Sequence, residues 1–452
     1  MHENTKKVFD VTEGPMMKKY ISYVIPLVLI TALQYSFNTA DAIVVGRWAN
    51  SRALGGVSAA GPICALMLSL FTGLSGGCSI RISKAIGEKN YDKAREYANV
   101  GVFVAILSGF IIGIIAIFFA RPLFELLNTP EENIDYAVTY MRIIFAGQPI
   151  VLLYNFGAAA IRALGDTKRP LIFMAIAGSL NVGLNVLLIA GFKMDADGVA
   201  IATIASNALS TILIFRALSK GTYMFNIKIK EAHFNPAMFK DILSTGLPLG
   251  IMGTLWSFSD TIVQSCINSL GASAVAGIGA ANSIITYGNI ASSGFSQATT
   301  TFAAQNSGAG KYDRVKQITS HSVIMGMLIT LCCASLIVIF RKPLINLFIT
   351  DDSAAIQAGG LKLLVVAPVL IISIAGGLHV NALQGMGKTM STTVVSLIFD
   401  CGFHIIWVYT AFAYSPTLIT LLSMSPILAI PSFIAKYILF RITIKKQTNS
   451  VS

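Results

Sequence analysis

The polar stretch GEKNYDKAR (87–95) has a counterpart 221 residues further along the chain, GAGKYDRVK (308–316). Each stretch separates two long apolar runs, and each carries Tyr-Asp at the same offset. Apolar helices resemble one another by composition alone, but polar loops do not. The pair therefore indicates an internal repeat, and that repeat predicts that the chain is organised in two similar halves.

The composition places this repeat in a membrane. Of the 452 residues, 54% are hydrophobic and 12% are charged, whereas a soluble protein typically carries about 25% charged residues. An apolar helix of about 20 residues crosses the hydrocarbon core. Twelve runs reach this length: 19–46, 54–82, 96–120, 138–161, 170–191, 197–218, 242–268, 273–303, 317–340, 356–383, 390–413 and 416–440.

Three further matches keep nearly the same offset. We therefore predict an all-α polytopic membrane protein with twelve transmembrane helices in two pseudo-symmetric six-helix lobes. The lobes span 15–220 and 241–441, joined by a cytoplasmic connector at 221–240. Six spans per lobe make the repeats parallel, which is one architecture of transporters. The matches are ALGGVSAAGPI (53–63) with AVAGIGAANSI (274–284), FARPLFELLNT (119–129) with FRKPLINLFIT (340–350), and RALGDTK (162–168) with NALQGMGK (381–388).

The basic residues predict the orientation. Cytoplasmic segments collect Lys and Arg, and an inner N-terminus puts 25 of the 33 Lys and Arg residues in inner segments, with Lys436 counted at the cytoplasmic end of the twelfth run. We expect a multi-pass protein of the cell inner (plasma) membrane with both termini cytoplasmic. The net charge of +12 then faces the anionic headgroups of the lipid bilayer and not nucleic acid.

Three of the 21 acidic residues lie inside apolar runs, namely Asp41, Asp260 and Asp400. A charge at the bilayer centre costs about 2.5–3.5 kcal/mol on insertion scales. Such residues usually face the protein interior and mark an ion or substrate path. The alternative is that each makes a structural hydrogen bond between helices.

Two of these acids belong to polar stripes on one helix face. Aromatic side chains accompany both stripes, and we select Tyr35 and Trp256 as substrate contacts. Carboxylates beside aromatic faces suit lipophilic cations, because each cation–π contact contributes roughly 0.5–2 kcal/mol. The stripes are Gln34, Asn38 and Asp41 in the first run, and Trp256, Asp260 and Gln264 in the seventh.

The third acid belongs to a pair that the repeat relates to two amides. Asn181 and Asn185 lie four residues apart in the fifth run, and an offset of 219 places them on Asp400 and His404 in the eleventh. Only the second pair titrates near neutral pH. It could therefore relay a proton, or His404 could simply hold Asp400 in a permanent hydrogen bond.

The sequence shows no P-loop, nucleophile elbow or HExxH motif. We therefore expect no enzyme and no cofactor beyond H⁺ or Na⁺ as a coupling ion. An ion gradient is the remaining common energy source for transport.

Four stretches together resemble the multidrug and toxic compound extrusion (MATE) transporters, over essentially the whole of 15–441. The resemblance implies two lobes of six helices and export of organic cations coupled to inward H⁺ or Na⁺. The stretches are FNTADAIVVGR (37–47), RISKAIGEKNYDKAR (81–95), IRALGDTKRP (161–170) and NALQGMGKT (381–389).

The resemblance also implies an ion-coupling site. The acid of the first-span motif falls on Asp41, and Asn155 and Asn181 match family asparagines. Some family members carry a second acid on the fifth span, where this chain has Asn185. Either Asp41 takes up a proton, or Asp41 binds Na⁺ with oxygens from Asn38 and these three asparagines.

Two alternatives remain open. A flippase for lipid-linked oligosaccharide would share the architecture, but it would need several basic residues in its cleft, and Arg142 and Lys362 are the only candidates. A non-transporting membrane receptor would leave the repeat and the intramembrane acids without a use. We expect a monomer that carries small-molecule organic cations, because the cleft lies within one chain.

Overall fold

The computed structural model describes residues 10–48, 51–126, 129–221 and 223–449. Helices dominate these ranges, and no strand occurs in them. The prediction of an all-α membrane protein is confirmed. Helices prevail because a chain crossing hydrocarbon must pair every backbone N–H and C=O internally.

The first half of the chain runs from α1 to α7. Two of its spans are interrupted: α4 and α5 meet at a bend of 51° beside Gly147, and α6 continues into a π-helical segment. The bounds are α1 (Met16–Trp48), α2 (Ser51–Gly87), α3 (Tyr91–Leu126), α4 (Glu131–Ala146), α5 (Gln148–Ala163), α6 (Lys168–Asn185), η1 (Val186–Gly191) and α7 (Ala196–Ser219).

The second half repeats this order, with a short 3₁₀ turn before it. Its eleventh span alternates between α- and π-helix. The bounds are η2 (Ile229–Glu231), α8 (Pro236–Ser269), α9 (Ala272–Gly288), α10 (Ile290–Gly308), α11 (Tyr312–Ile339), α12 (Arg341–Asn346), α13 (Ser353–Gly385), α14 (Thr389–Ser396), η3 (Leu397–Gly402), α15 (Phe403–Trp407), η4 (Val408–Phe412) and α16 (Leu418–Asn449).

Twelve spans result when interrupted helices are joined. Within the described ranges, nine helices are long and apolar enough to cross a membrane, and the bent pair of α4 and α5 makes a tenth. The other two of the twelve predicted spans correspond to α8 and the pair of α9 and α10, which do not meet these criteria of length and hydropathy in the described ranges. The helix α8 holds the polar residues Asp260 and Gln264 within its length.

The chain forms two compact units. The N-terminal unit comprises residues up to 11 and 29–250, and the C-terminal unit comprises 12–28 and 251–452. The helices α1 and α8 each contribute to both units, because the division falls within them. Residues 221–240, expected as a connector, contain η2 and the first turn of α8 and belong to the N-terminal unit.

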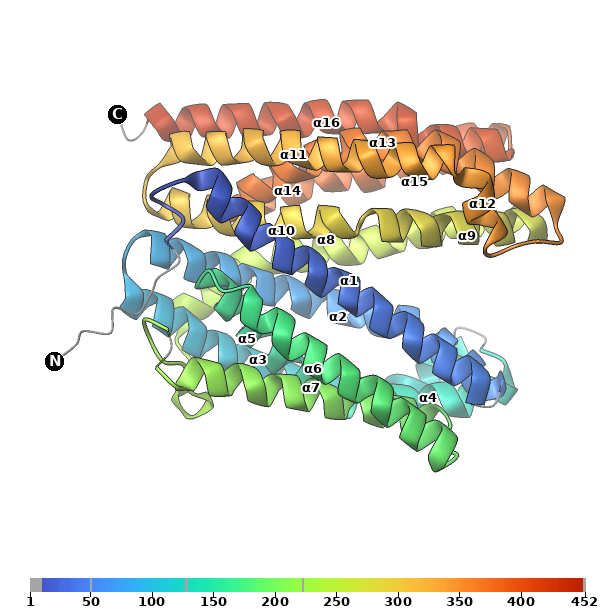
Figure 1. Cartoon of the computed structure of the whole chain (residues 1–452), viewed down its shortest axis with the longest axis horizontal. Helices are drawn as coiled ribbons and strands as arrows, with labels where there is room; N and C mark the ends of the chain where they lie inside the picture. Colours follow the sequence, from blue (N-terminus) through green and yellow to red (C-terminus); the bar gives the residue numbers. More distant parts are fainter. Residues whose placement is uncertain (1–9, 49–50, 127–128, 222, 450–452) are drawn as a thin grey trace. The chain divides into compact units, whose positions relative to one another are not determined.

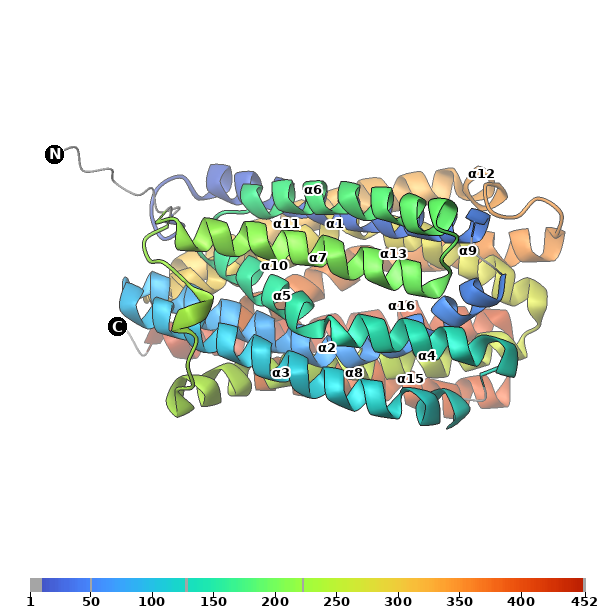
Figure 2. The ribbon, with the colours of Figure 1, turned by 90° about the horizontal axis from the view of Figure 1, so that it is seen from below.

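In the N-terminal unit, α2 packs against α3, α4 and α5, and α6 packs against α7 (Figure 2). Two pairs of glycines bring α2 against the first part of α8. A Cβ on Gly77 would lie 2.5 Å from Cα of Gly246, and Gly73 meets Gly250 in the same way. Small residues four apart allow such close backbone approach in membranes, where dispersion contacts hold helices together.

In the C-terminal unit, α13 is the central helix and contacts α9, α10, α11 and α16 (Figure 1). Asp352 begins α13: its side chain accepts hydrogen bonds from the backbone N–H groups of Ala354 and Ala355, each at 3.0 Å. These bonds satisfy two of the four N–H groups that every helix start leaves without an intrahelical partner. A core of small and aliphatic side chains, including Leu363 and Ala367, follows along the helix.

Candidate functional site

The site in the N-terminal unit begins with a close approach of α1 to α6. The ring of Phe37 lies directly on Gly178, where any added Cβ would collide with the ring. Asp41 follows Phe37 by about one turn, and Asn181 and Asn185 follow Gly178 by about one and two turns. The contact therefore sets the carboxylate of α1 opposite the two amides of α6.

Asp41 lies within hydrogen-bonding distance of both amides. Asn185 Nδ2 donates to Asp41 Oδ1 at 2.6 Å. With its amide nitrogen turned to Asp41, Asn181 donates to Oδ1 at 2.7 Å and to Oδ2 at 3.1 Å. Asn185 is fully buried, Asn181 is 6% exposed, and Asp41 is half-buried. No Lys or Arg in the described ranges forms an ion pair with Asp41, so neutral groups alone hold it.

An amide can present either donors or an acceptor, because its nitrogen and oxygen exchange places on rotation. When the oxygen of Asn181 is turned inward, it accepts from Asn185 Nδ2 at 3.4 Å. The same residues can thus donate to an ionised Asp41 or offer oxygen to a proton or metal ion bound there. Oxygen donors suit hard cations such as Na⁺, and the site is chemically able to hold one.

The other residues predicted for these two roles are less buried than the two amides. Gln34, Tyr35 and Asn38 are exposed on α1, and Asn155 is half-buried on α5. Among the described residues, no hydrogen bond joins Asn38 or Asn155 to Asp41. Their roles in ion coupling or substrate binding stay predictions.

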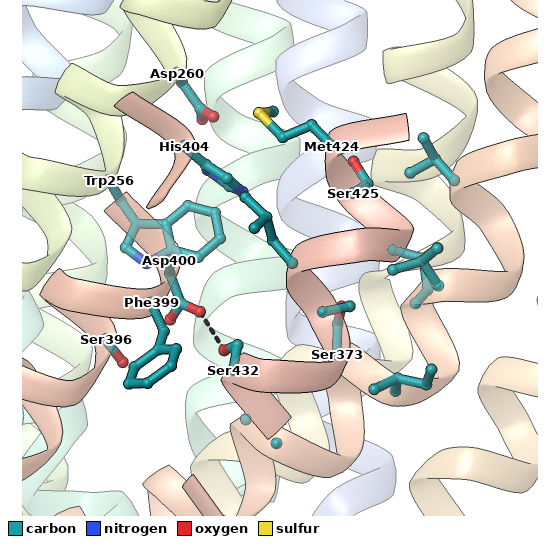
Figure 3. Close-up of a pocket in the computed structure, with 18 of the residues that line it drawn as sticks. Trp256, Asp260, Ser373, Ser396, Phe399, Asp400, His404, Met424, Ser425 and Ser432 are labelled. Carbon is teal, nitrogen blue, oxygen red and sulfur yellow. Dashed lines mark hydrogen bonds between the residues drawn. The ribbon is translucent and has the colours of Figure 1, made fainter. Parts of the chain in front are cut away.

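A second candidate site is a cavity of about 630 Å³ within the C-terminal unit. Helices α8, α9, α13 and α16 and the broken span α14–α15 line it, and Trp256, Asp260, Asp400 and His404 contribute side chains (Figure 3). Gln264, predicted for the same site, is not among the lining residues and donates to Asn268 at 2.9 Å. The volume falls within the range of roughly 300–1,000 Å³ that is common for small-molecule sites.

Asp400 forms a buried ion pair in this cavity. Lys436 Nζ donates to its two carboxylate oxygens at 2.8 and 2.7 Å. The Ser432 hydroxyl donates to Oδ1 at 2.6 Å (Figure 3). Both ionised side chains are 11% exposed. The hydrogen bond between Asp400 and His404, which was one of the two alternatives for this pair, does not occur in the described structure; Lys436 and Ser432 are the partners of the carboxylate instead.

This pair corrects the assignment of Lys436 to the cytoplasmic end of its span. Lys436 as a whole residue is 9% exposed, and its stem packs beside Gly376 of α13. Tyr-Ile-Leu-Phe follows Lys436 before the next basic residue, which placed it more than one turn inside the apolar run. This spacing was the one signal in the sequence that Lys436 is buried. Its partner Asp400 gave no such signal, because it lies on another helix.

The repeated order of spans in the two halves and the polar sites within those spans are typical of a polytopic membrane transporter. The MatE family model matches the chain twice, at residues 26–187 and 248–410, one match in each half. The chain belongs to this family, the multidrug and toxic compound extrusion transporters, as its motifs predicted.

Curated relatives and solved structures agree with this assignment. The probable multidrug resistance protein YpnP of Bacillus subtilis is 32% identical over 77% of this chain and 78% of its own length. The multidrug export protein MepA of Staphylococcus aureus is 22% identical over 87% of each chain. A solved outward-facing multidrug resistance MATE transporter of the MOP superfamily has a TM-score of 0.91 and 22% identity, covering 98% of this chain and 99% of its own. The predicted two-lobe fold is confirmed.

Proposed function

We propose that the protein exports lipophilic organic cations in exchange for H⁺ or Na⁺, by alternating access of its two lobes. It acts as a monomer in the plasma membrane with both termini in the cytoplasm. The names of the relatives YpnP and MepA, which refer to multidrug resistance and multidrug export, support the class of cargo. The surplus of basic residues in every second loop supports the orientation.

The observation that carries the coupling proposal is the set of partners around Asp41. Two neutral amides hold its carboxylate at 2.6 and 2.7 Å. A carboxylate without a cationic partner inside a membrane is costly, so a bound H⁺ or Na⁺ is stabilised by cancelling its charge. Release of that cation restores the charge and favours the other arrangement of α1 and α6.

A change of amide orientation supplies the difference between the two states. In the ionised state, Asn181 and Asn185 donate N–H groups to Asp41. In the cation-bound state, they turn oxygens toward the cation. A ligand shifts a conformational equilibrium only by its differential affinity for the two states, and this reversal gives H⁺ or Na⁺ such a difference.

Replacement of Asp41 tests the proposal. Asp41→Asn keeps the size of the side chain and removes its titratable charge. We expect the variant to reach the membrane at the wild-type level but to lose export of ethidium from cells that lack other exporters. Asp92→Asn, the same change at an exposed position in the first turn of α3, is the matched control and should export normally. Undiminished export by Asp41→Asn would refute the coupling role.

The choice of ion and the alternative functions need purified protein. In proteoliposomes loaded with a fluorescent cation, a pH gradient and a Na⁺ gradient are imposed in turn. Movement under one gradient identifies the coupling ion, and no movement under either favours the receptor. The flippase is disfavoured because Asp400 neutralises Lys436, which leaves Lys362 as the cationic residue that its cavity offers.

A further inference from the structure

Four fully ionisable side chains line the cavity of the C-terminal unit: Asp260, Asp400, Lys362 and Lys436. Two of them cancel each other, because Lys436 and Asp400 form a closed ion pair with two contacts under 3 Å. The remaining two carry opposite charges. The cavity is therefore close to neutral overall, yet it presents one free carboxylate and one ammonium group.

Lys362 has only a neutral partner. Its Nζ donates to Asn282 Oδ1 of α9 at 2.5 Å, and no acid in the described ranges lies within ion-pair distance. An ammonium group has three donors, so this single bond leaves two of them for a ligand. A charge-assisted bond to a carboxylate is roughly twice as strong as a bond between neutral groups.

Asp260, on α8, is the acidic counterpart of Lys362 in this cavity. It makes neither an ion pair nor a hydrogen bond within the described part of the chain, although it interacts electrostatically with His404 and Lys362. Trp256 lies one turn before it, 44% exposed, and both side chains line the cavity (Figure 3). A carboxylate beside an indole face is suited to an organic cation.

We propose that this cavity binds zwitterionic organic molecules, with the cationic part beside Asp260 and Trp256 and an anionic group on Lys362. The inference refines the substrate class and therefore rests on the proposed export function. A simple cation would satisfy Asp260 but leave the ammonium of Lys362 without a counter-charge. A ligand that carries both charges supplies both missing partners and adds no net charge to the membrane interior.

The rest of the lining fits such a ligand. Phe399 and Met424 contribute apolar and polarisable surface to the cavity, and Ser373 and Ser425 add hydroxyl groups (Figure 3). Sites of this kind are mostly apolar, with a few polar groups that fix the orientation of the ligand. Opposite charges at separate points give that orientation, because reversal of the ligand would place like charges together.

Two dyes that differ only in the anionic group test the inference. Rhodamine 110 carries a free carboxylate and is zwitterionic, whereas rhodamine 123 is its methyl ester and is a cation. Binding of each dye to the purified full-length protein is measured by fluorescence polarisation. We expect the wild type to bind rhodamine 110 at least as tightly as rhodamine 123.

Variants test whether the charge of Lys362 is responsible for the binding of rhodamine 110. In Lys362→Met, which keeps the length of the side chain without its charge, binding of rhodamine 110 should weaken by about tenfold or more, as expected for loss of a charge-assisted bond. Binding of rhodamine 123 should change little. Lys362→Arg should retain the preference, and Lys342→Met, at an exposed position in α12, should behave as the wild type. Asp260→Asn should weaken both dyes.

Three outcomes would overturn the inference. The first is a clear preference of the wild type for the ester, and the second is an equal loss of both dyes in Lys362→Met. In either case, export of the ester would leave the proposed cation export intact. The third outcome is that neither dye binds to nor is exported by the wild type, and that result counts against the export function as well.

Discussion

Two intramembrane carboxylates, one in each unit, are held in opposite ways. Asp41 of α1 receives hydrogen bonds from two neutral amides of α6. Asp400, in the π-helical segment η3, accepts a hydrogen bond from Ser432 and forms an ion pair with Lys436, and both partners lie on α16. In the part of the chain that the structure describes, the first carboxylate has no cationic partner, whereas the second is paired with Lys436.

The repeat makes this difference informative. Asn181 and Asn185 in the fifth span occupy the positions of Asp400 and His404 in the eleventh. In the first half the acid faces these positions from another helix, and in the second half it stands at one of them. Within the described residues, related backbones thus carry a carboxylate held by neutral amides in one half and a closed ion pair in the other.

Both spans also contain π-helix, which often marks functional sites. The segment η1 follows directly after Asn185, and η3 contains Asp400 itself. A π-turn widens the helix and reorients the side chains around it. The two halves therefore keep a similar local irregularity while they differ in the charge that it displays.

The largest expected effect comes from opening the closed pair. Lys436→Met leaves Asp400 buried without its cation, and removal of one partner from a buried ion pair typically costs about 3–5 kcal/mol. We expect a clearly lower thermal unfolding temperature for the purified protein in detergent. The double variant Lys436→Met with Asp400→Asn should recover most of the loss, since it leaves no buried charge.

This prediction discriminates between a structural pair and an exchangeable site. A single Lys436→Met variant as stable as the wild type would mean that Asp400 exchanges its partners as freely as Asp41 is proposed to do. The comparison between the two units would then fail at its central point.

A moderate effect is expected from the contact that positions Asp41. Gly178→Ala puts a methyl group against the ring of Phe37, and overpacking of this kind costs typically about 1–3 kcal/mol. Since α1 must move away from α6, the bond from Asn185 to Asp41 should lengthen. The initial rate of ion-driven dye export in proteoliposomes should fall.

The matched control lies on the same helix. A Cβ on Gly183 meets open space, so Gly183→Ala should export at the wild-type rate. Equal rates for the two variants would show that the approach of α1 to α6 does not position Asp41.

The smallest effect concerns an exposed pair outside the membrane. His233 lies in the segment that follows η2. Its ring nitrogens form hydrogen bonds with the backbone carbonyl of Glu231 at 2.9 Å and with the Glu96 carboxylate at 2.8 Å, and these bonds raise the pKa of His233. A pKa raised by folding adds stability at pH values below the unfolded value, and this stability is lost as pH rises through the folded value.

Because this pair is solvent-exposed, its contribution should be at most about 1 kcal/mol. The unfolding temperature of the wild type should exceed that of His233→Gln at pH 5.5, and the difference should shrink by pH 8.5. A difference that grows with pH would contradict the assigned direction. If the assigned direction holds, the losses of unfolding temperature in His233→Gln and in Lys436→Met together show how much burial adds to the contribution of an ion pair.

The candidate sites were only partly predictable. The stripe spacing and the family resemblance led to Asp41, Asn181 and Asn185, and the structure brings these three together. No hydrogen bond joins Asn38 or Asn155 to Asp41 in the described structure, because a motif position does not specify which way a side chain turns. Lys436 was missed as a site residue, since its partner Asp400 is distant in sequence and only the packing of α16 against the eleventh span joins them.

The sequence by itself determined the membrane setting, the twofold repeat and the family, since these follow from composition and from similarity along the chain. It also identified the acids whose burial needed an explanation. Only the tertiary structure decided which charges are cancelled and which are available to an ion or a ligand. The physical reason is that the energy of a buried charge depends on partners a few ångströms away, and those partners come from other helices.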